Sequence, residues 1–230
     1  CMFHKVTTGC GMTTLVLENQ VKYVVAMPYT NLIANKSTYC TDKGIKHLAI
    51  YSEGNQVSDI LTFTGNKILC TYDQLKNVTQ AINASEWKLL VDEAHILLTS
   101  AGYRRKAVQG VLDSFKAYKS YVFGSATHHD DKYQLNQLKG IDSVELQWAN
   151  LQPVEVVKTV VPTNLYDHAA VMVSKYIAGS LTGNAHIFVN SVDSILRTIN
   201  KSTAKAVRVV CAPTEYNEAK IQNFNRRAGT

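Results

Sequence analysis

The sequence predicts an α/β protein with a parallel sheet and helices on both of its faces. Short apolar runs of strand length alternate along the chain with amphipathic stretches of helix length, and this alternation is typical of parallel sheets. Hydrophobic residues make up 46% of the 230 residues, which is enough for a core and excludes a disordered chain. No apolar run approaches the ~18 residues of a membrane span, so no membrane partner is expected.

The predicted elements follow one another in a regular order. Strands are expected at residues 2–6, 23–27, 68–71, 88–91 and 121–123. Helices are expected to begin at Met12 or Thr13 and to cover 29–39, 72–82 and 108–118. The basic run Arg104-Arg105-Lys106 is interpreted as solvated surface.

The pattern changes near residue 150, around Leu151-Gln152-Pro153. Beyond it, strands are expected at 154–161, 185–189 and 207–211, and helices at 167–178, at 192–198 and from 215 onward. We therefore expect one domain over residues 1–150 and part of a second over residues 151–230.

Charge and cysteine usage narrow the function classes. The net charge of +6 permits a nucleic-acid partner without establishing one. The five cysteines are odd in number and widely spaced, with no C-x-x-C. A disulfide framework and a zinc ribbon are therefore not expected, and the composition favours a reducing, intracellular setting, either the cytoplasm or, for a viral protein, that of the host.

Residues 7–14 read T-T-G-C-G-M-T-T and lie between a predicted strand and a predicted helix. In that position backbone N–H groups can surround a phosphate, and Gly9 and Gly11 would let the backbone approach it closely. The full phosphate-loop pattern is G-x-x-x-x-G-K-[ST]. Here Val6 stands at the first glycine position and Met12 at the lysine position, so the loop alone fits a plain strand-to-helix turn equally well.

Residues 89–95 read L-L-V-D-E-A-H, so Asp92 and Glu93 end a buried strand. Carboxylates in that place are costly unless they hold a metal or a proton, and strand ends face the crevice where parallel sheets bind ligands. Asp92 is suited to Mg²⁺ and Glu93 to polarising water. The alternative is a helix N-terminus with favourable acidic residues.

A third polar group follows the strand at 121–123, where residues 123–127 read F-G-S-A-T. By themselves, Ser125 and Thr127 fit an ordinary turn in which a hydroxyl bonds the backbone.

Taken together, T-G-C-G-M-T, D-E-A-H and S-A-T, in this order and spacing, resemble the motifs of the superfamily-two helicases of the DEAD/DEAH-box side. Residues 27–32, 70–75 and 187–191 are similar to motif Ia, the strand-end threonine motif and motif IV of that family. The resemblance covers about residues 2–225. It implies a RecA-like P-loop NTPase domain over 1–150 and part of a second RecA-like domain over 151–230, truncated before motifs V and VI.

The resemblance also implies a role for each matching residue. The ATP phosphates would be surrounded by Thr8, Gly9, Cys10, Gly11, Met12, Thr13 and Thr14. Mg²⁺ would be held by Thr13 and Asp92, and Glu93 would activate water. Nucleotide state would be coupled to domain movement by His95, Ser125 and Thr127. Nucleic acid would run along Pro28, Thr30, Thr71, Asn190 and Ser191.

Three departures from the family pattern affect these expectations. Met12 replaces the phosphate-binding lysine, and losing one electrostatic donor costs on the order of 10²–10³ in rate in other enzymes. Lys5 lies nearby in the sequence, which does not place its side chain. Neither the Q-x-x-G-R-x-x-R motif of the arginine finger nor an adenine-reading glutamine motif occurs. Since the chain starts at Cys1 and ends at Thr230, we expect a fragment. Because the arginine-finger motif is missing from it, we expect this fragment to hydrolyse ATP poorly by itself.

The function expected from these residues is that of an ATP-dependent helicase or translocase. It would use Mg-ATP hydrolysis to move on or unwind nucleic acid, with DNA slightly preferred over RNA. Two alternatives stay open at this point: a nucleotide- or nucleic-acid-binding module in which Met12 has ended catalysis, and a Met12 introduced to trap a bound state. The intact Asp92–Glu93 pair favours the enzyme.

Overall fold

The computed structural model describes residues 1–5, 9–127, 133–146, 164–181, 188, 191–202 and 214–228. The chain divides into two compact units, Cys1–Leu151 and Gln152–Thr230. Of the residues described, no helix is both long and apolar enough to cross a membrane. The four described cysteines (Cys1, Cys10, Cys40 and Cys70) form no disulfide.

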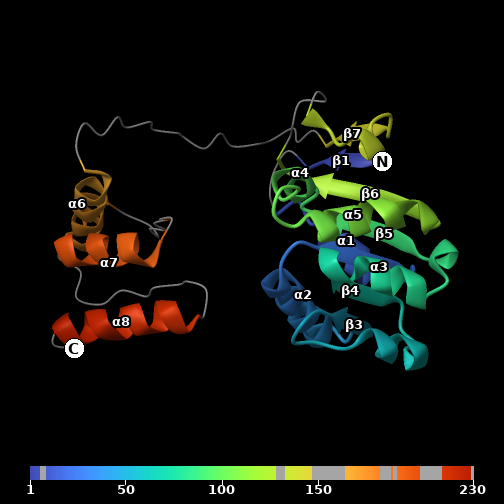
Figure 1. The fold of residues 1–230 in the computed structure, drawn as a ribbon, viewed down its shortest axis with the longest axis horizontal. Coiled ribbons are helices and arrows are strands. Elements are labelled where there is room, and N and C mark those ends of the chain that lie inside the picture. Colours follow the sequence, from blue (N-terminus) through green and yellow to red (C-terminus); the bar gives the residue numbers. More distant parts are fainter. Residues whose placement is uncertain are drawn as a thin grey trace. The chain divides into compact units, whose positions relative to one another are not determined.

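Within its described residues, the first unit contains one seven-stranded sheet in which all paired strands run parallel (Figure 1). The strands are β1 (Met2–His4), β2 (Tyr23–Met27), β3 (His47–Ile50), β4 (Lys67–Thr71), β5 (Lys88–Asp92), β6 (Ser120–Ser125) and β7 (Ser143–Glu145). Their order across the sheet is β3-β4-β2-β5-β6-β1-β7. Strand β6 therefore separates β1, which precedes the glycine loop, from β5, which ends in Asp92.

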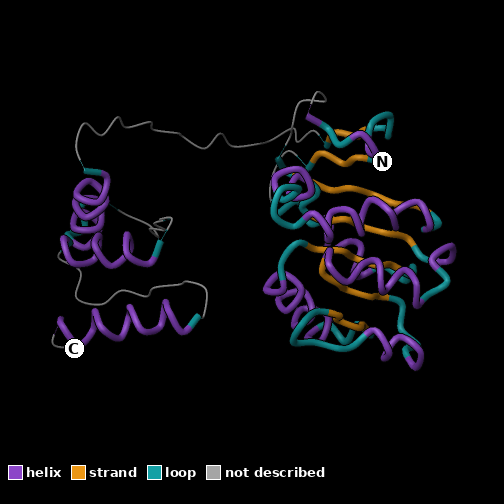
Figure 2. Tube along the Cα trace, viewed as in Figure 1, coloured by secondary structure: helices purple, strands orange, loops and turns teal. Residues whose placement is uncertain are grey.

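Helices alternate with these strands along the chain (Figure 2). They are α1 (Met12–Glu18), α2 (Thr30–Asp42), α3 (Tyr72–Ala81), α4 (His95–Thr99) and α5 (Arg105–Ser114). Short 3₁₀ turns lie at Val57–Thr62, Ala84–Glu86, Phe115–Ala117 and Asn136–Leu138.

The two faces of the sheet bury alternate residues of each central strand. In β2, Val24 and Ala26 pack in the cluster that holds the apolar residues of α3 and α5, whereas Val25 and Met27 pack in the cluster with those of α1 and α2. The side-chain period of two in a strand explains this division, and burial on both faces explains why the strands read as continuous apolar runs. The predicted fold class, an α/β domain with helices on both faces of a parallel sheet, is confirmed for the first unit.

Several predicted boundaries were wrong. Strand β1 ends at His4 rather than at Val6, which lies outside the described residues. The helix predicted over 108–118 begins at Arg105 and passes into a 3₁₀ turn after Ser114. The sequence analysis missed β3 and β7. Strand β7 is exposed throughout, so it carries no apolar signal.

The described part of the second unit consists of α6 (Leu165–Ile177), α7 (Val192–Lys201) and α8 (Glu215–Ala228). Side-chain caps begin two of them: Asn164 Oδ1 accepts the Tyr166 N–H at 3.0 Å, and Ser191 Oγ accepts the Ser194 N–H at 3.2 Å. All three helices lie close to predicted ones. The strands predicted at 154–161 and 207–211 lie outside the described residues, and of 185–189 only Phe188 is described.

Lys67, at the amino end of β4, is a fully buried lysine that no described carboxylate pairs with. Its Nζ donates to the Val21 carbonyl and, at 3.3 Å, to Asn19 Oδ1. Burial lowers the pKa of Lys67 to about 8.

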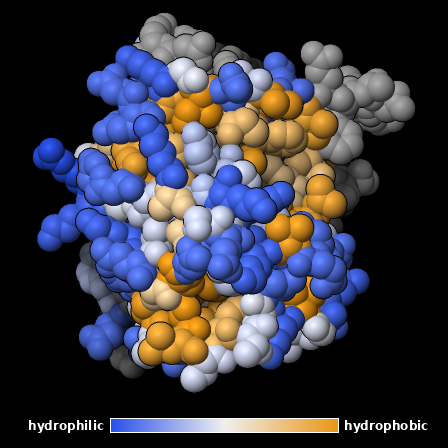
Figure 3. Space-filling model, turned by 90° about the vertical axis from the view of Figure 1, so that its right-hand side faces the viewer, coloured by the Kyte–Doolittle hydropathy of each residue, from blue (hydrophilic) through white to orange (hydrophobic). Residues whose placement is uncertain are grey.

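Figure 3 shows hydrophilic and hydrophobic side chains interspersed on the side of the molecule that lies to the right in Figure 1.

We predict that folding stability rises by ~1 kcal/mol between about pH 7 and pH 9 because of Lys67. Below the folded pKa both states carry the proton and the cost of burying the charge is complete; above it the folded state is neutral while the unfolded chain still binds the proton, so stability increases. Lys67→Met should remove this rise and stabilise the chain at pH 7. Urea unfolding at the two pH values measures the effect. Lys88→Met, at the amino end of β5, should keep the rise, and a rise that persists in Lys67→Met would contradict the prediction.

Candidate functional site

The carboxyl ends of the parallel strands bring the predicted polar residues to one edge of the sheet. Asp92 ends β5 and is in register with Gly124 of β6, while Ser125 of β6 is in register with His4 of β1. On the other side of β5, Thr71 of β4 is in register with Met27 of β2. The motifs, which are spread over more than a hundred residues of sequence, therefore meet along one line.

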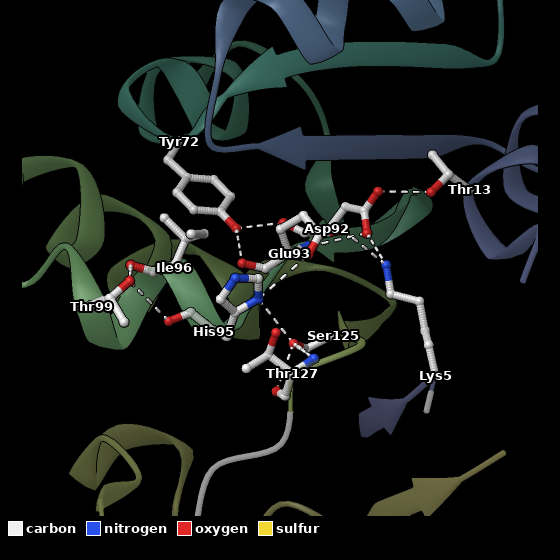
Figure 4. A network of polar contacts seen from close by, with 10 residues as sticks. All are labelled: Lys5, Thr13, Tyr72, Asp92, Glu93, His95, Ile96, Thr99, Ser125 and Thr127. Carbon is white, nitrogen blue, oxygen red and sulfur yellow. Dashed lines mark hydrogen bonds and ion pairs between the residues drawn. The ribbon is translucent and has the colours of Figure 1, made fainter. Parts of the chain in front are cut away.

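Asp92 is the centre of a buried polar cluster at this edge (Figure 4). Lys5 Nζ lies 2.7 Å from Asp92 Oδ1, and Thr13 Oγ1 donates to Asp92 Oδ2 at 2.7 Å. The backbone N–H of Glu93 also donates to Oδ1, at 3.0 Å. The three residues Lys5, Thr13 and Asp92 are only 6%, 8% and 7% exposed. The carboxylate is thus held on both oxygens inside the protein.

Lys5 is a member of this cluster that the sequence could not place. Its side chain pairs with Asp92 and also reaches Glu93 Oε1 at 3.4 Å. Burial by itself would lower the pKa of Lys5, but the two carboxylates outweigh it and the pKa is raised. The ammonium group is therefore charged at neutral pH.

Glu93 has a backbone conformation that side-chain-bearing residues seldom adopt. Its φ is 55°, the one positive φ among the described non-glycine residues, and such strain persists only where surrounding contacts hold it. Tyr72 provides two of them, because its hydroxyl donates to the carbonyls of Asp92 at 2.5 Å and of Glu93 at 3.2 Å. Tyr72 is fully buried, and burial first, then the neighbouring carboxylates, raise its pKa well above the ordinary value.

The sequence analysis did not single out Tyr72. Its position as the first residue of α3, directly after the strand-end Thr71, is the only signal in the sequence that points to it.

His95, Ser125 and Thr127 form a second polar group that adjoins the first. His95 Nδ1 lies 3.0 Å from Ser125 Oγ and 3.4 Å from Glu93 Oε2. The Ser125 hydroxyl donates to the Thr127 carbonyl at 2.9 Å and accepts the Thr127 N–H at 3.0 Å. Since that hydroxyl proton is used, a proton on His95 Nδ1 completes the arrangement by pointing at Ser125 Oγ.

A cavity of about 420 Å³ opens beside this second group. His95, Ser125 and Thr127 contribute to its wall together with His4, Leu138 and Ile141. His95 therefore borders this cavity on the β1 and β7 side of the sheet and also contacts the Glu93 carboxylate.

The glycine loop has the conformation expected of a backbone cradle. Gly9 and Gly11 have φ values of 78° and 82°, and the space that a Cβ would occupy at either position is open. Gly11 is the N-cap of α1, and among the described residues no side chain caps the first N–H groups of that helix. Cys10 and Thr14 are half-buried in the same segment, whereas Thr8 lies outside the described residues. Open N–H groups of this kind suit an anion.

Met12 packs against the sheet, and its thioether lies over the backbone of β6. A Cβ at Gly124 would lie 2.1 Å from Met12 Cε and 3.0 Å from its Sδ. The side chain also packs against the core cluster on the α1 and α2 face. Position 12 therefore contributes apolar packing and no charge.

The residues expected to follow nucleic acid are distributed over both units. Pro28 is buried, Thr30 is exposed at the start of α2, and Thr71 is buried at the N-cap of α3. Ser191 is exposed at the N-cap of α7 in the second unit, and Asn190 lies outside the described residues. The structure thus brings Pro28, Thr30 and Thr71 to the ends of neighbouring strands.

The interpretation of Arg104 as solvated surface was wrong. Its side chain is half-buried because Nη1 donates to the Pro28 carbonyl at 2.7 Å and Nη2 pairs with Asp73. The guanidinium group therefore fixes the loop after β2 to the start of α3.

The donors around Asp92 fit a magnesium–nucleotide site better than a metal site made by the protein alone. No group of three or more His, Cys, Asp or Glu residues that could hold a metal occurs in the described part of the chain. Mg²⁺ in nucleotide sites takes one or two protein oxygens, with phosphate and water as its other ligands. The carboxylate of Asp92 and the hydroxyl of Thr13, 2.7 Å apart, are oxygens of this kind.

The chain is similar to solved structures, and the other two comparisons with known proteins find nothing. No family model matches the chain, and no curated protein matches it. Among solved structures, a hypothetical ATP-dependent RNA helicase from Sulfolobus tokodaii is 19% identical, with a TM-score of 0.47 over 63% of this chain and 47% of that one. The Hef helicase domain from Pyrococcus furiosus is 13% identical, with a TM-score of 0.48 over 100% and 50%.

The SWI2/SNF2 ATPase core of Sulfolobus solfataricus, solved in complex with double-stranded DNA, is 17% identical, with a TM-score of 0.44 over 60% and 30% of the two chains. The present chain thus spans about half the length or less of these proteins. Similarity at this level says nothing about activity.

We predict that Tyr72→Phe lowers the free energy of unfolding by ~1–3 kcal/mol, because it leaves two buried carbonyls without their donor. Tyr118→Phe is the matched control, since it removes a hydroxyl bonded at 2.9 Å to Thr79 Oγ1 away from the site. Urea unfolding measures both losses, and the amide NMR signals of Glu93 and His95 should shift only in Tyr72→Phe. Unchanged signals would show that the tyrosine does not hold the Glu93 backbone.

Proposed function

We propose that this chain binds Mg-ATP at the Asp92 cluster and belongs to an ATP-dependent helicase or translocase of superfamily two. The observation that carries the proposal is the contact of Thr13 and Asp92, the two expected magnesium ligands, beside an open glycine loop and next to Glu93. The motif resemblance supplies the function class. The same proposal assigns residues 151–230 to part of a second RecA-like domain.

In this proposal the loop residues from Thr8 to Thr14, Cys10 included, surround the phosphates, and Thr13 and Asp92 hold Mg²⁺. The metal would neutralise charge on the phosphates. Glu93 is the general base that takes a proton from water. Its two carboxylate oxygens lie 3.4 Å from Lys5 Nζ and 3.4 Å from His95 Nδ1, so the carboxylate is oriented by a cation on one side and a histidine on the other.

His95 couples this site to Ser125 and Thr127 in the proposal. A movement of the Glu93 carboxylate would displace His95 Nδ1, and His95 would in turn displace Ser125 Oγ. Ser125 Oγ accepts the Thr127 N–H. The backbone at Thr127 would then respond to the nucleotide state. The coupling therefore needs only a chain of contacts that the structure contains.

Nucleic acid is the proposed substrate, held mainly through its backbone by Pro28, Thr30 and Thr71 of the first unit and Asn190 and Ser191 of the second. Contacts of this kind carry no strong sequence preference. We propose DNA as the slightly preferred nucleic acid over RNA.

A binding module without turnover is the second candidate, and Met12 is the observation that favours it. The thioether fills the space over Gly124, so position 12 offers no charge to a phosphate. Binding and turnover therefore need separate measurements.

We predict that the chain binds a fluorescent ATP analogue in the presence of Mg²⁺. Asp92→Asn should weaken this binding at least ~10-fold, because a magnesium ligand loses its charge. Glu93→Gln should leave binding within ~3-fold and lower any turnover by ~10²-fold or more, because the general base is lost.

Asp113→Asn is the control for these variants, since its carboxylate is solvent-accessible and lies 3.8 Å from Lys76. It should behave as the unchanged chain does. Absence of Mg-ATP binding would overturn the proposed function. Because this chain is expected to hydrolyse ATP poorly by itself, turnover is measured in a longer protein that supplies the arginine-finger motif, and binding without turnover there would leave the binding module.

We predict that Thr30→Asp weakens binding of a labelled single strand by roughly 10-fold at low salt, because a carboxylate there would repel phosphates. Thr41→Asp, near the other end of α2, adds the same charge away from the strand ends and should have little effect. Fluorescence anisotropy with DNA and RNA of one sequence, over a series of salt concentrations, tests both the nucleic-acid contact at Thr30 and the preference for DNA. Equal losses of affinity in both variants would exclude a nucleic-acid contact at Thr30.

A further inference from the structure

We propose that Lys5 supplies, from the end of β1, the positive charge toward the nucleotide phosphates that position 12 lacks. This inference rests on the proposed function and names the residue that lets the site work without a lysine in the glycine loop.

The backbone places Lys5 at the site. The Lys5 N–H donates to the Ser125 carbonyl at 2.8 Å, so the residue continues the ladder between β1 and β6 beyond the last residue of β1. From there the side chain reaches past the end of β6 to Asp92 on β5. Figure 4 shows this side chain extending from the β1 side toward Asp92.

Lys5 and Thr13 hold different oxygens of one carboxylate. Lys5 Nζ is on Asp92 Oδ1 and Thr13 Oγ1 is on Oδ2. The ammonium group thus lies directly beside the proposed magnesium ligands and 3.4 Å from the proposed general base, Glu93. A charge at this place acts on the reacting end of a bound nucleotide rather than on its base or ribose.

Among the described residues of the first unit, no lysine or arginine other than Lys5 pairs with Asp92 or Glu93. Lys22 pairs with Glu86, Lys76 with Asp113 and Arg104 with Asp73. Phosphoryl transfer depends on positive charge that neutralises the transferring group, and Lys5 is the described side chain placed to add it to that of a metal.

Met12 and Lys5 thus divide two tasks that one lysine performs in the family pattern. Met12 packs over Gly124 and so forms an apolar contact between α1 and β6. Lys5 carries the charge. A purely structural Lys5, which only neutralises Asp92, is the competing explanation. It predicts a loss of stability when Lys5 is changed, without a specific loss of phosphate binding.

The first test is covalent labelling of the unchanged chain with an acyl-phosphate derivative of ATP. The lysine ammonium group beside the phosphates first loses one proton to solvent. The free amine then attacks the acyl carbonyl, an amide bond forms as the acyl–oxygen bond to phosphate breaks, ATP leaves, and a second proton passes from the nitrogen to solvent. Peptide mass spectrometry should find Lys5 acylated, with protection by excess Mg-ATP and none by adenosine. Lys22, exposed beside Glu86, is the internal control for unprotected labelling. Labelling that spares Lys5, or that Mg-ATP does not prevent, would overturn the inference.

The second test moves the charge. Lys5→Met should weaken Mg-ATP binding at least ~10-fold and AMP binding much less, because the loss depends on the outer phosphates. The double variant Lys5→Met with Met12→Lys should recover most of the affinity, and Lys22→Met should change nothing.

Equal losses for ATP and AMP, or no recovery in the double variant, would leave Lys5 a structural role only. Mg-ATP binding by the unchanged chain that survives Lys5→Met would overturn this inference and leave the proposed function intact. Absence of binding by the unchanged chain would overturn both.

Discussion

The buried ion pair between Lys5 and Asp92 is the constraint on which the rest of the site depends. Two charges lie inside the protein at the carboxyl edge of the sheet, 2.7 Å apart. Removing one partner of such a pair typically costs about 3–5 kcal/mol, because the other is left buried and uncompensated. The pair links the end of β1 to the end of β5 across β6, so the strand order and the placement of the glycine loop must both be correct for either charge to be tolerated.

The neighbouring contacts build outward from that pair. Thr13 joins the first turn of α1 to Asp92, and Tyr72 joins the start of α3 to the backbone that follows it. Glu93 sits between these supports with a positive φ, a conformation that costs free energy and that the buried tyrosine hydroxyl helps to hold. The strained Glu93 backbone is held by Tyr72, and its carboxylate lies beside Lys5 and His95, so the group is pre-organised. His95 continues the contact to Ser125.

Met12 shows how packing and charge can be separated in one loop. A methionine over Gly124 makes the contact between α1 and β6 apolar, whereas a charged side chain in the same place would have to leave it to reach water or a phosphate. With the charge carried by a residue from a strand end, the helix no longer has to provide it. The glycine at position 124 is part of the same arrangement, since a side chain there would displace the thioether.

The sequence by itself determined the α/β class, most of the central strands and the polar residues at their ends, because apolar periodicity and strand-end carboxylates are local signals. It could not show that Lys5 pairs with Asp92, 87 residues away, or that the Tyr72 hydroxyl holds the Glu93 backbone. The sequence also did not reveal the exposed edge strand β7 or the partial burial of Arg104. Only the tertiary structure decided these points, because contacts between strand ends depend on the order of strands across the sheet, and local patterns do not encode that order.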